Sequence, residues 1–191
     1  ESLPRSVKTN YHAAVAKTLK ADFSGTAPEV VAHHYTVAGM AAEAVAEWHL
    51  AGQVALGAFA LVDSANHIRR GLSVLEQLPE SPERLRNELS LRVTLGAPIM
   101  LMTGFASSEV KAHTDDLWRL CTQAGASAAD LQFAALWFLW TVAEVSGNFP
   151  RAQEMGERLL ELAELTKQSV IMLVARTGLG GAHLMRGNLE Q

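Results

Sequence analysis

Gly147-Asn148-Phe149 recurs as Gly187-Asn188-Leu189, forty residues further along the chain. Each copy follows a helical pattern of apolar residues, and the first copy also precedes one. A small-residue turn that recurs every roughly 34 to 47 residues is typical of an array of two-helix hairpins, because each hairpin needs a tight corner and neighbouring hairpins stack to bury what neither buries alone. The pattern therefore predicts an all-α protein built from repeated helix hairpins.

The composition favours a folded chain and argues against a nucleic-acid partner. Hydrophobic residues make up 49% of the 191 residues, which is enough for a substantial core and excludes disorder as the main state. The 16 Lys and Arg residues are outnumbered by 20 Asp and Glu residues, so the formal net charge is -4. Such a chain has no general positive field to hold a phosphate backbone, and we expect no direct nucleic-acid binding.

Cysteine content and hydropathy indicate the compartment. Cys121 is the single cysteine, which excludes disulfides within the chain and is typical of a reducing compartment; we expect a buried core thiol. The densest apolar run, residues 133–142, is about half of the roughly 18 to 20 residues that a bilayer span needs. The first residue is Glu1 and no leader pattern follows it, so we expect an excised or processed chain. Together these features predict a cytoplasmic protein without a membrane span.

Proline and glycine punctuate the helical pattern. Pro28 and Gly39 bracket one short helix, and Ser81-Pro82 begins another, in keeping with the preference for proline in the first turn and glycine after the last. Ser107 or Ser108 is expected to cap a further helix. The predicted helices cover about residues 6–23, 28–38, 40–56, 60–78, 83–102, 107–123, 128–145, 150–166 and 168–186.

These helices suggest a domain organisation. Residues 1–39 are predicted to form a helical lead-in from an upstream module, and residues 40–191 to hold the repeats, at about 40–79, 80–125, 126–166 and a truncated 167–191. The next expected signature residue, an alanine, would fall just after Gln191. We therefore expect the chain to be a fragment that ends inside a repeat.

Two of the predicted helices are unusual. Pro98 lies inside the helix at 83–102, where it has no amide hydrogen for the carbonyl of Thr94, so a kink or a break is expected. The helix at 128–145 is apolar on nearly every side, through residues such as Trp137 and Trp140. A helix of this kind is sandwiched between neighbours, so we expect it at the centre of the stack.

Small and large residues recur at fixed steps around the turns. Leu179-Gly180 precedes Gly187 by seven positions, while Gly147, Phe149 and Ala152 supply a turn glycine, an aromatic residue and an alanine. This arrangement resembles the tetratricopeptide repeat in degenerate form. The signature positions are Trp48, Gly52, Leu95, Gly96, Gly104, Gly147, Phe149, Ala152, Leu179, Gly180 and Gly187.

The chain departs from the standard repeat at two positions. Trp140 occupies the position of the third unit where the repeat has a small residue in its first helix, and Phe59 stands where the first turn glycine belongs. The small positions are 44, 44 and 40 residues apart, between Gly52, Gly96, Trp140 and Gly180, so the helices are longer than in the standard repeat. The resemblance implies a right-handed superhelix of antiparallel helix hairpins, an α-α superhelix.

The long repeats also resemble the C-terminal region of large bacterial signalling proteins. The resemblance rests on the segments 33–39, 75–83, 95–98 and 104–110 together with the repeat lengths. In those adenylate or guanylate cyclases and STAND-type regulatory ATPases, repeats of this kind follow a catalytic or ATPase module. Neither the aspartates of a cyclase nor a glycine-rich phosphate loop is found in the 191 residues. The resemblance implies a regulatory or scaffolding arm that is not itself an enzyme.

Three short motifs could carry chemistry, and each has a structural explanation that we favour. His33-His34 could bind a metal, but neighbouring helical residues point about 100° apart, so packing or hydrogen bonding is expected. Gly178-Leu179-Gly180-Gly181 falls within a helix rather than after a strand, which favours close helix packing over a dinucleotide loop. Asp115-Asp116 has no third oxygen ligand nearby in sequence. We expect no catalytic, cofactor-binding or metal-binding residues.

Met100, Trp137 and Trp140 are the candidates for an apolar groove, although core packing is the commoner use of such residues. The main hypothesis is a non-catalytic module that binds a protein, a peptide or another domain of the same chain. The alternative is a small-molecule-sensing repeat domain of a transcriptional regulator, with an apolar pocket near these three residues. We also expect an exposed terminal hairpin to pack against a second copy or a crystal neighbour through Val170, Ile171 and Val174, unless the last helix folds back.

Overall fold

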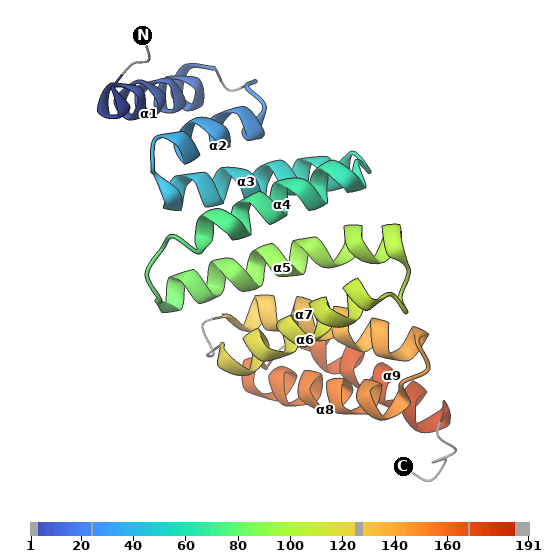
Figure 1. Cartoon of the computed structure of the whole chain (residues 1–191). Helices are drawn as coiled ribbons and strands as arrows, with labels where there is room; N and C mark the ends of the chain where they lie inside the picture. The colour runs from blue at the N-terminus through green and yellow to red at the C-terminus, as the bar shows by residue number, and fades with distance from the viewer. Residues whose placement is uncertain (1–3, 24, 125–127, 168, 186–191) are drawn as a thin grey trace. The chain divides into compact units, whose positions relative to one another are not determined.

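The computed structural model describes residues 4–23, 25–124, 128–167 and 169–185, and this part of the chain is helical without any strand (Figure 1). The all-α prediction is therefore confirmed for the described residues. Their helices are α1 (Arg5–Asp22), α2 (Pro28–Val37), α3 (Ala41–Gly57), α4 (Leu61–Leu75), α5 (Pro82–Thr103), α6 (Ser108–Gln123), α7 (Ala129–Val145), α8 (Phe149–Thr166) and α9 (Ser169–Met185).

The helix ends follow the local signals in the sequence. Ser107 is the N-cap of α6, and its side chain accepts a hydrogen bond from the backbone N–H of Val110 at 3.1 Å. Asn148 caps α8 in the same way, by accepting from the N–H of Arg151. Pro28 stands in the first turn of α2. A backbone N–H at this position has no acceptor within the helix, so proline loses no hydrogen bond there.

Three helices end in the same left-handed turn. Gly39, Phe59 and Gly147 have φ values of 71°, 59° and 75°, and each donates its N–H to the carbonyl three residues earlier. In each turn the next residue donates to the carbonyl five residues before it. This pattern satisfies carbonyls that the helix end leaves without partners. Phe59 therefore adopts the same backbone conformation as the glycines of the other two turns.

The chain divides into two compact units, Glu1–Pro98 and Ile99–Gln191. In the first unit α1 packs against α2, α2 against α3, and α3 against α4. The α3–α4 pair is especially close at Gly52, where a Cβ atom would lie 2.3 Å from Cδ1 of Ile68. Ser64 of α4 is fully buried at this crossing and donates to the carbonyl of Gly52 at 2.8 Å.

In the second unit α7 packs against α6, α8 and α9, and α8 also packs against α9. The expected sandwiched position of the helix at 128–145 is thus observed. Buried leucines and a methionine of α6, α7 and α8 form the core of this unit, namely Leu117, Leu120, Leu136, Leu139, Met155 and Leu159. Lys167 follows α8 in a left-handed conformation, with φ of 54°.

The structure bears on the break expected at Pro98 and on the lead-in expected to end at residue 39. Helix α5 continues through the buried Pro98, so the break considered at this proline does not occur. Leu95 and Ile99, on either side of Pro98, are both buried, and this burial offsets the roughly 3 kcal/mol that an interior proline costs a helix. Helices on both sides of residue 39, the expected end of the lead-in, belong to the first unit.

Within the described residues, each helix is too short or too polar to span a bilayer.

Candidate functional site

The signature residues predicted for the starts of the first two repeats are buried in α3 and α5 of the first unit. Trp48 is buried, its indole N–H donates to Thr36 Oγ1 at 3.0 Å, and its ring stacks on His67 with 5.6 Å between centroids. Gly52 follows Trp48 by four residues on α3 and lies against Ile68 of α4. Leu95 and Gly96 are both buried in α5.

The signature residues of the second unit are distributed between turns and crossings. Gly104 and Gly147 have positive φ values, Phe149 is half-buried, and Ala152 is fully buried. Gly187 lies outside the described residues.

Leu179 and Gly180, both in α9, have different surroundings. Leu179 packs against Gly156 of α8, where an added Cβ would lie 2.9 Å from the leucine side chain. Gly180 is exposed and an added Cβ would meet nothing within 4 Å. The close approach to α7 falls instead at Gly178, whose added Cβ would lie 3.0 Å from the Trp140 ring.

Of the three groove candidates, two are brought together. Trp137 and Trp140 stack with 4.9 Å between ring centroids, and Trp137 remains 41% exposed. Met100 is half-buried. None of the three lines the pocket described below. Ile171 is buried within its own chain, so this residue offers no surface to a second copy, and the side chains of Val170 and Val174 lie outside the described residues.

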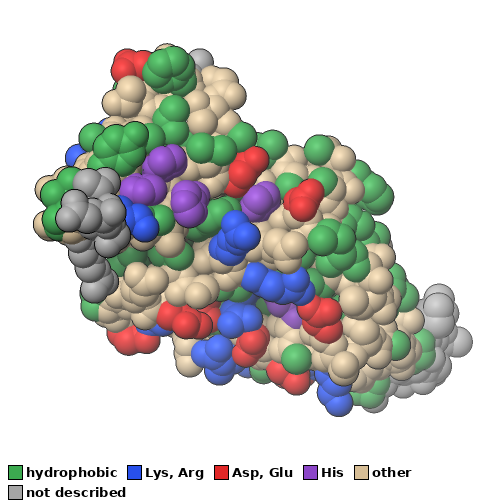
Figure 2. Space-filling view, turned by 45° about the horizontal axis from the view of Figure 1, so that its top comes forward, with side chains coloured by type: hydrophobic (Ala, Val, Ile, Leu, Met, Phe, Trp, Pro, Cys, Tyr) green, Lys and Arg blue, Asp and Glu red, His purple; other side chains and the backbone are tan. Residues whose placement is uncertain are grey.

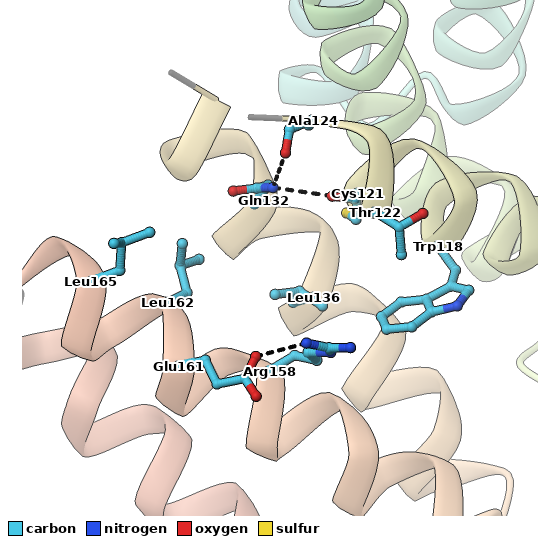
Figure 3. Close-up of a pocket in the computed structure, with 10 residues that line it drawn as sticks. All are labelled: Trp118, Cys121, Thr122, Ala124, Gln132, Leu136, Arg158, Glu161, Leu162 and Leu165. Atoms are coloured by element: carbon cyan, nitrogen blue, oxygen red, sulfur yellow. Dashed lines mark hydrogen bonds and ion pairs between the residues drawn. The ribbon is translucent and has the colours of Figure 1, made fainter. Parts of the chain in front are cut away.

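A pocket of about 320 Å³ opens between α6, α7 and α8, entirely within the second unit (Figure 3). Its apolar lining comes from one leucine of α7, two leucines of α8 and a tryptophan, an alanine and a cysteine from α6 and the residue after it. Its polar lining consists of a threonine, a glutamine and an ion pair. The lining residues are Trp118, Cys121, Thr122, Ala124, Gln132, Leu136, Arg158, Glu161, Leu162 and Leu165.

Gln132 fixes the end of α6 over one side of this pocket. Its side-chain amide Nε2 donates to the carbonyl of Cys121 at 3.1 Å and to the carbonyl of Ala124 at 2.8 Å. The Cys121 carbonyl belongs to the last turn of α6 and the Ala124 carbonyl to the residue that follows the helix, so no helical N–H satisfies either of them. One side chain of α7 therefore closes the C-terminus of α6, and Figure 3 shows both bonds at the pocket edge.

Charged and aromatic side chains form the opposite rim. Arg158 donates to Glu161 at 2.8 Å on α8, and this hydrogen bond with the nearby carboxylates raises the pKa of Arg158. Both side chains are more than half exposed, so the pair contributes little to stability. The guanidinium of Arg151 lies over the ring of Trp118, 4.6 Å from the ring centroid.

Cys121 is a poor nucleophile in this setting. The residue is buried, and burial raises the pKa of its thiol to about 12. The thiolate is the reactive form of cysteine, and its fraction near neutral pH is therefore very small. Cys121 acts as an apolar part of the pocket wall.

The remaining sequence motifs do not converge on a metal centre. Among the described residues no group of three or more histidine, cysteine or acidic side chains has a geometry that could hold a metal ion. Asp116 pairs with Arg119 at 3.5 Å on α6. The ring of His12 in α1 lies close to the rings of His33 and His34 in α2. The sequence pattern did not predict this contact.

Sequence reasoning also did not find the pocket, although one signal was present. Gln132 is a polar residue on a helix that is otherwise apolar nearly all round. Such a residue needs a partner when it is buried, and its partners here are carbonyls eight and eleven positions earlier in the chain. Neither a scan against protein-family models nor a search of curated proteins found a match for this chain.

Proposed function

We propose that this chain is a non-catalytic interaction module of a larger bacterial signalling protein, of the kind that carries a nucleotide cyclase or a regulatory ATPase module. In this proposal the helices form a tetratricopeptide-like superhelix that binds a protein, a peptide or another domain of the same chain. The observation that carries the proposal is the open pocket between α6, α7 and α8, which has an apolar floor and a charged rim.

The repeat architecture is supported by the period of the turns. Left-handed residues at positions 59, 104 and 147 are 45 and 43 positions apart, which matches the length of a two-helix unit. The contact of α7 with α9 gives further support, because alternate helices touch when hairpins stack side by side.

The pocket is suited to one apolar side chain of a partner. A volume of about 320 Å³ holds a leucine, methionine or phenylalanine side chain with room to spare. Leu136 and Leu162 are buried at its base, whereas Leu165 is 68% exposed at its edge and would cover the inserted group. Binding energy concentrates at such anchor pockets, where a central apolar group is desolvated and a polar rim excludes water.

Site-specific photo-crosslinking tests this proposal in the full-length protein. A benzoylphenylalanine placed at Leu165 is expected to crosslink a partner protein or another domain through one defined segment. The same group at Leu173 is the matched control, because this leucine is 69% exposed in the same unit and does not line the pocket. A crosslink from Leu173 to a second copy would support pairing through the terminal hairpin instead.

A second pair of variants tests whether the pocket itself is needed. Thr122 and Thr114 both lie on α6, and each donates its hydroxyl to the carbonyl three residues earlier at 2.7 Å. Only Thr122 lines the pocket. Thr122→Tyr is expected to abolish the crosslink from Leu165, and Thr114→Tyr to leave it intact. Equal crosslinking in both variants would refute a pocket-based interaction.

The alternative function is small-molecule sensing at the same pocket, as in a transcriptional regulator. The pocket volume favours this reading, since it falls at the lower end of the range of about 300 to 1,000 Å³ that small-molecule sites occupy. A thermal-shift screen separates the two functions, because a specific ligand raises the melting temperature in proportion to the logarithm of its excess over Kd. A hit whose effect Thr122→Tyr removes and Thr114→Tyr retains would favour the sensor.

A further inference from the structure

Three histidines from two helices meet in the first unit. His12 of α1 lies 4.8 Å from His34 and 6.2 Å from His33, both of α2, measured between ring centroids. His33 and His34 are 5.8 Å apart by the same measure. We call these three residues the histidine cluster. Histidine side chains are seen together at the surface in Figure 2.

Two ring nitrogens of the cluster are buried without a hydrogen-bond partner. They are Nδ1 of His12 and Nδ1 of His34. A neutral imidazole tolerates this arrangement, because the unpartnered nitrogen can be the one without a proton. A protonated imidazole carries N–H groups on both nitrogens, so each of these rings would then bury a donor that has no acceptor.

The charges around His34 make its protonation still less favourable. The charges that bear on His34 are those of His12 and His33, and burial together with these two rings lowers the pKa of His34. On α1, Tyr11 packs edge-on against His12. The acidic groups described on α3, Glu43 and Glu47, act on Lys20 of α1 rather than on His34.

Few contacts other than the histidine cluster hold helix α1 in place. Ala16 is its one fully buried residue among those described, while Val7, Tyr11 and Phe23 are largely exposed. A short ion pair joins Lys20 to the buried Glu47 of α3, and the Lys20 side chain is itself 58% exposed. Few apolar contacts therefore oppose a force that pushes α1 away from α2.

We propose that the histidine cluster is an acid-sensitive latch, which holds α1 against α2 while its rings are neutral and releases α1 when they are protonated. Protonation places like charges within 4.8 to 6.2 Å of one another and buries unpaired donors at the α1–α2 contact. Release moves His12 away from the two rings on α2, and water can then solvate the buried nitrogens of His12 and His34.

The direction of the effect follows from the lowered pKa of His34. A histidine whose pKa is lower in the packed state has little effect on packing above the ordinary pKa of about 6.5, where it is neutral in both states, and disfavours packing as the pH falls below that value. At pH 5.5, one unit below 6.5, a ring that can be protonated only after release favours release about tenfold. The latch is thus closed at pH 7.5 and weaker at pH 5.5, by up to about tenfold through the His34 ring.

Hydrogen–deuterium exchange of the full chain tests the latch, with rates corrected for the intrinsic effect of pH on amide exchange. Protection of the α1 amides is expected to fall by up to about tenfold between pH 7.5 and 5.5. In the variant with His12→Gln, His33→Gln and His34→Gln, which has neutral side chains at all three positions, this fall is expected to disappear. The comparison is made between two pH values within each variant, so a general loss of stability does not imitate the result.

His67→Gln is the matched control. His67 also has a buried Nδ1 without a partner, but its ring stacks on Trp48 of α3 and lies outside the histidine cluster. This variant should keep the acid response of α1. The proposal is overturned if the triple variant retains the acid response, if wild-type α1 shows none, or if a chelator changes α1 protection at pH 7.5, since that last result would mean that the cluster holds a metal.

Discussion

Gly52→Ala places a methyl group at the glycine with the shortest added-Cβ contact described in the first unit. The new Cβ would lie 2.3 Å from Cδ1 and 2.6 Å from Cγ1 of Ile68. Rotation about χ2 can move Cδ1 away, but Cγ1 is fixed by χ1, which is stiff for a β-branched residue in a helix. Ile68 is also fully buried, so its side chain has little room to turn. The clash must therefore be relieved by moving α3 away from α4.

The expected cost is about 1 to 2 kcal/mol. Overpacking a well-packed core by one methyl group costs about 1 to 3 kcal/mol. Alanine recovers about 0.5 to 1 kcal/mol relative to glycine within a helix. Moving the two helices apart also lengthens the hydrogen bond from Ser64 to the carbonyl of Gly52.

Urea unfolding followed by far-UV circular dichroism measures this cost. Gly180→Ala is the control, because Gly180 lies inside α9, is exposed, and has nothing within 4 Å of an added Cβ. This control is expected to stabilise the protein by about 0.5 to 1 kcal/mol through helix propensity alone.

A double-mutant cycle identifies the clashing atoms. Ile68→Ala removes both Cγ1 and Cδ1, so Gly52→Ala should cost nothing further in that background. Ile68→Val removes Cδ1 but keeps a methyl group at the Cγ1 position, and should relieve only part of the clash. If Gly52→Ala proves as stable as the wild type, or if its effect is unchanged by Ile68→Ala, the close approach of α3 and α4 is not what requires a glycine.

Three further outcomes are expected. Phe59→Gly should raise the free energy of unfolding by about 1 kcal/mol, because Phe59 is 71% exposed and holds a left-handed conformation that costs most residues about 1 to 2 kcal/mol; unchanged or lower stability in urea would contradict this. Ser107→Ala should lower the free energy of unfolding by about 1 kcal/mol through loss of the α6 cap, measured in the same way, with Ser108→Ala as a control that leaves the cap bond in place. Cys121 should react with a disulfide reagent at pH 8 at least about tenfold more slowly in the native protein than in urea, because its pKa is raised to about 12, and equal rates would show that the thiol is accessible.

Local signals explain why most helix ends could be predicted. Ser107 caps α6 and the glycines at 39 and 147 end their helices through bonds to residues at most five positions away. Phe59 was recognised as the substitute for a turn glycine from its place in the repeat, although its own residue type gives no hint of a positive φ. Such features depend on short stretches of backbone, which the sequence specifies directly.

Features that depend on how helices cross were not predictable. Leu179 and Gly178 make the close contacts of α9, whereas Gly180 is exposed, because a small rotation of the helix decides which of three neighbouring residues faces α8 or α7. The meeting of His12 with His34 and the hydrogen bonds of Gln132 to α6 depend on the same tertiary geometry. Helical periodicity identifies a face but does not say which residue of another helix will meet it.

The packing of each helix against its neighbours in the chain also bears on how the protein folds. In the first unit α1 meets α2, α2 meets α3 and α3 meets α4, and in the second unit α6 to α9 follow the same order. Contacts between segments close in sequence need little loop closure, and domains rich in them reach the native state in microseconds to milliseconds. Each hairpin can therefore form as soon as its second helix leaves the ribosome, without waiting for residues that are synthesised later.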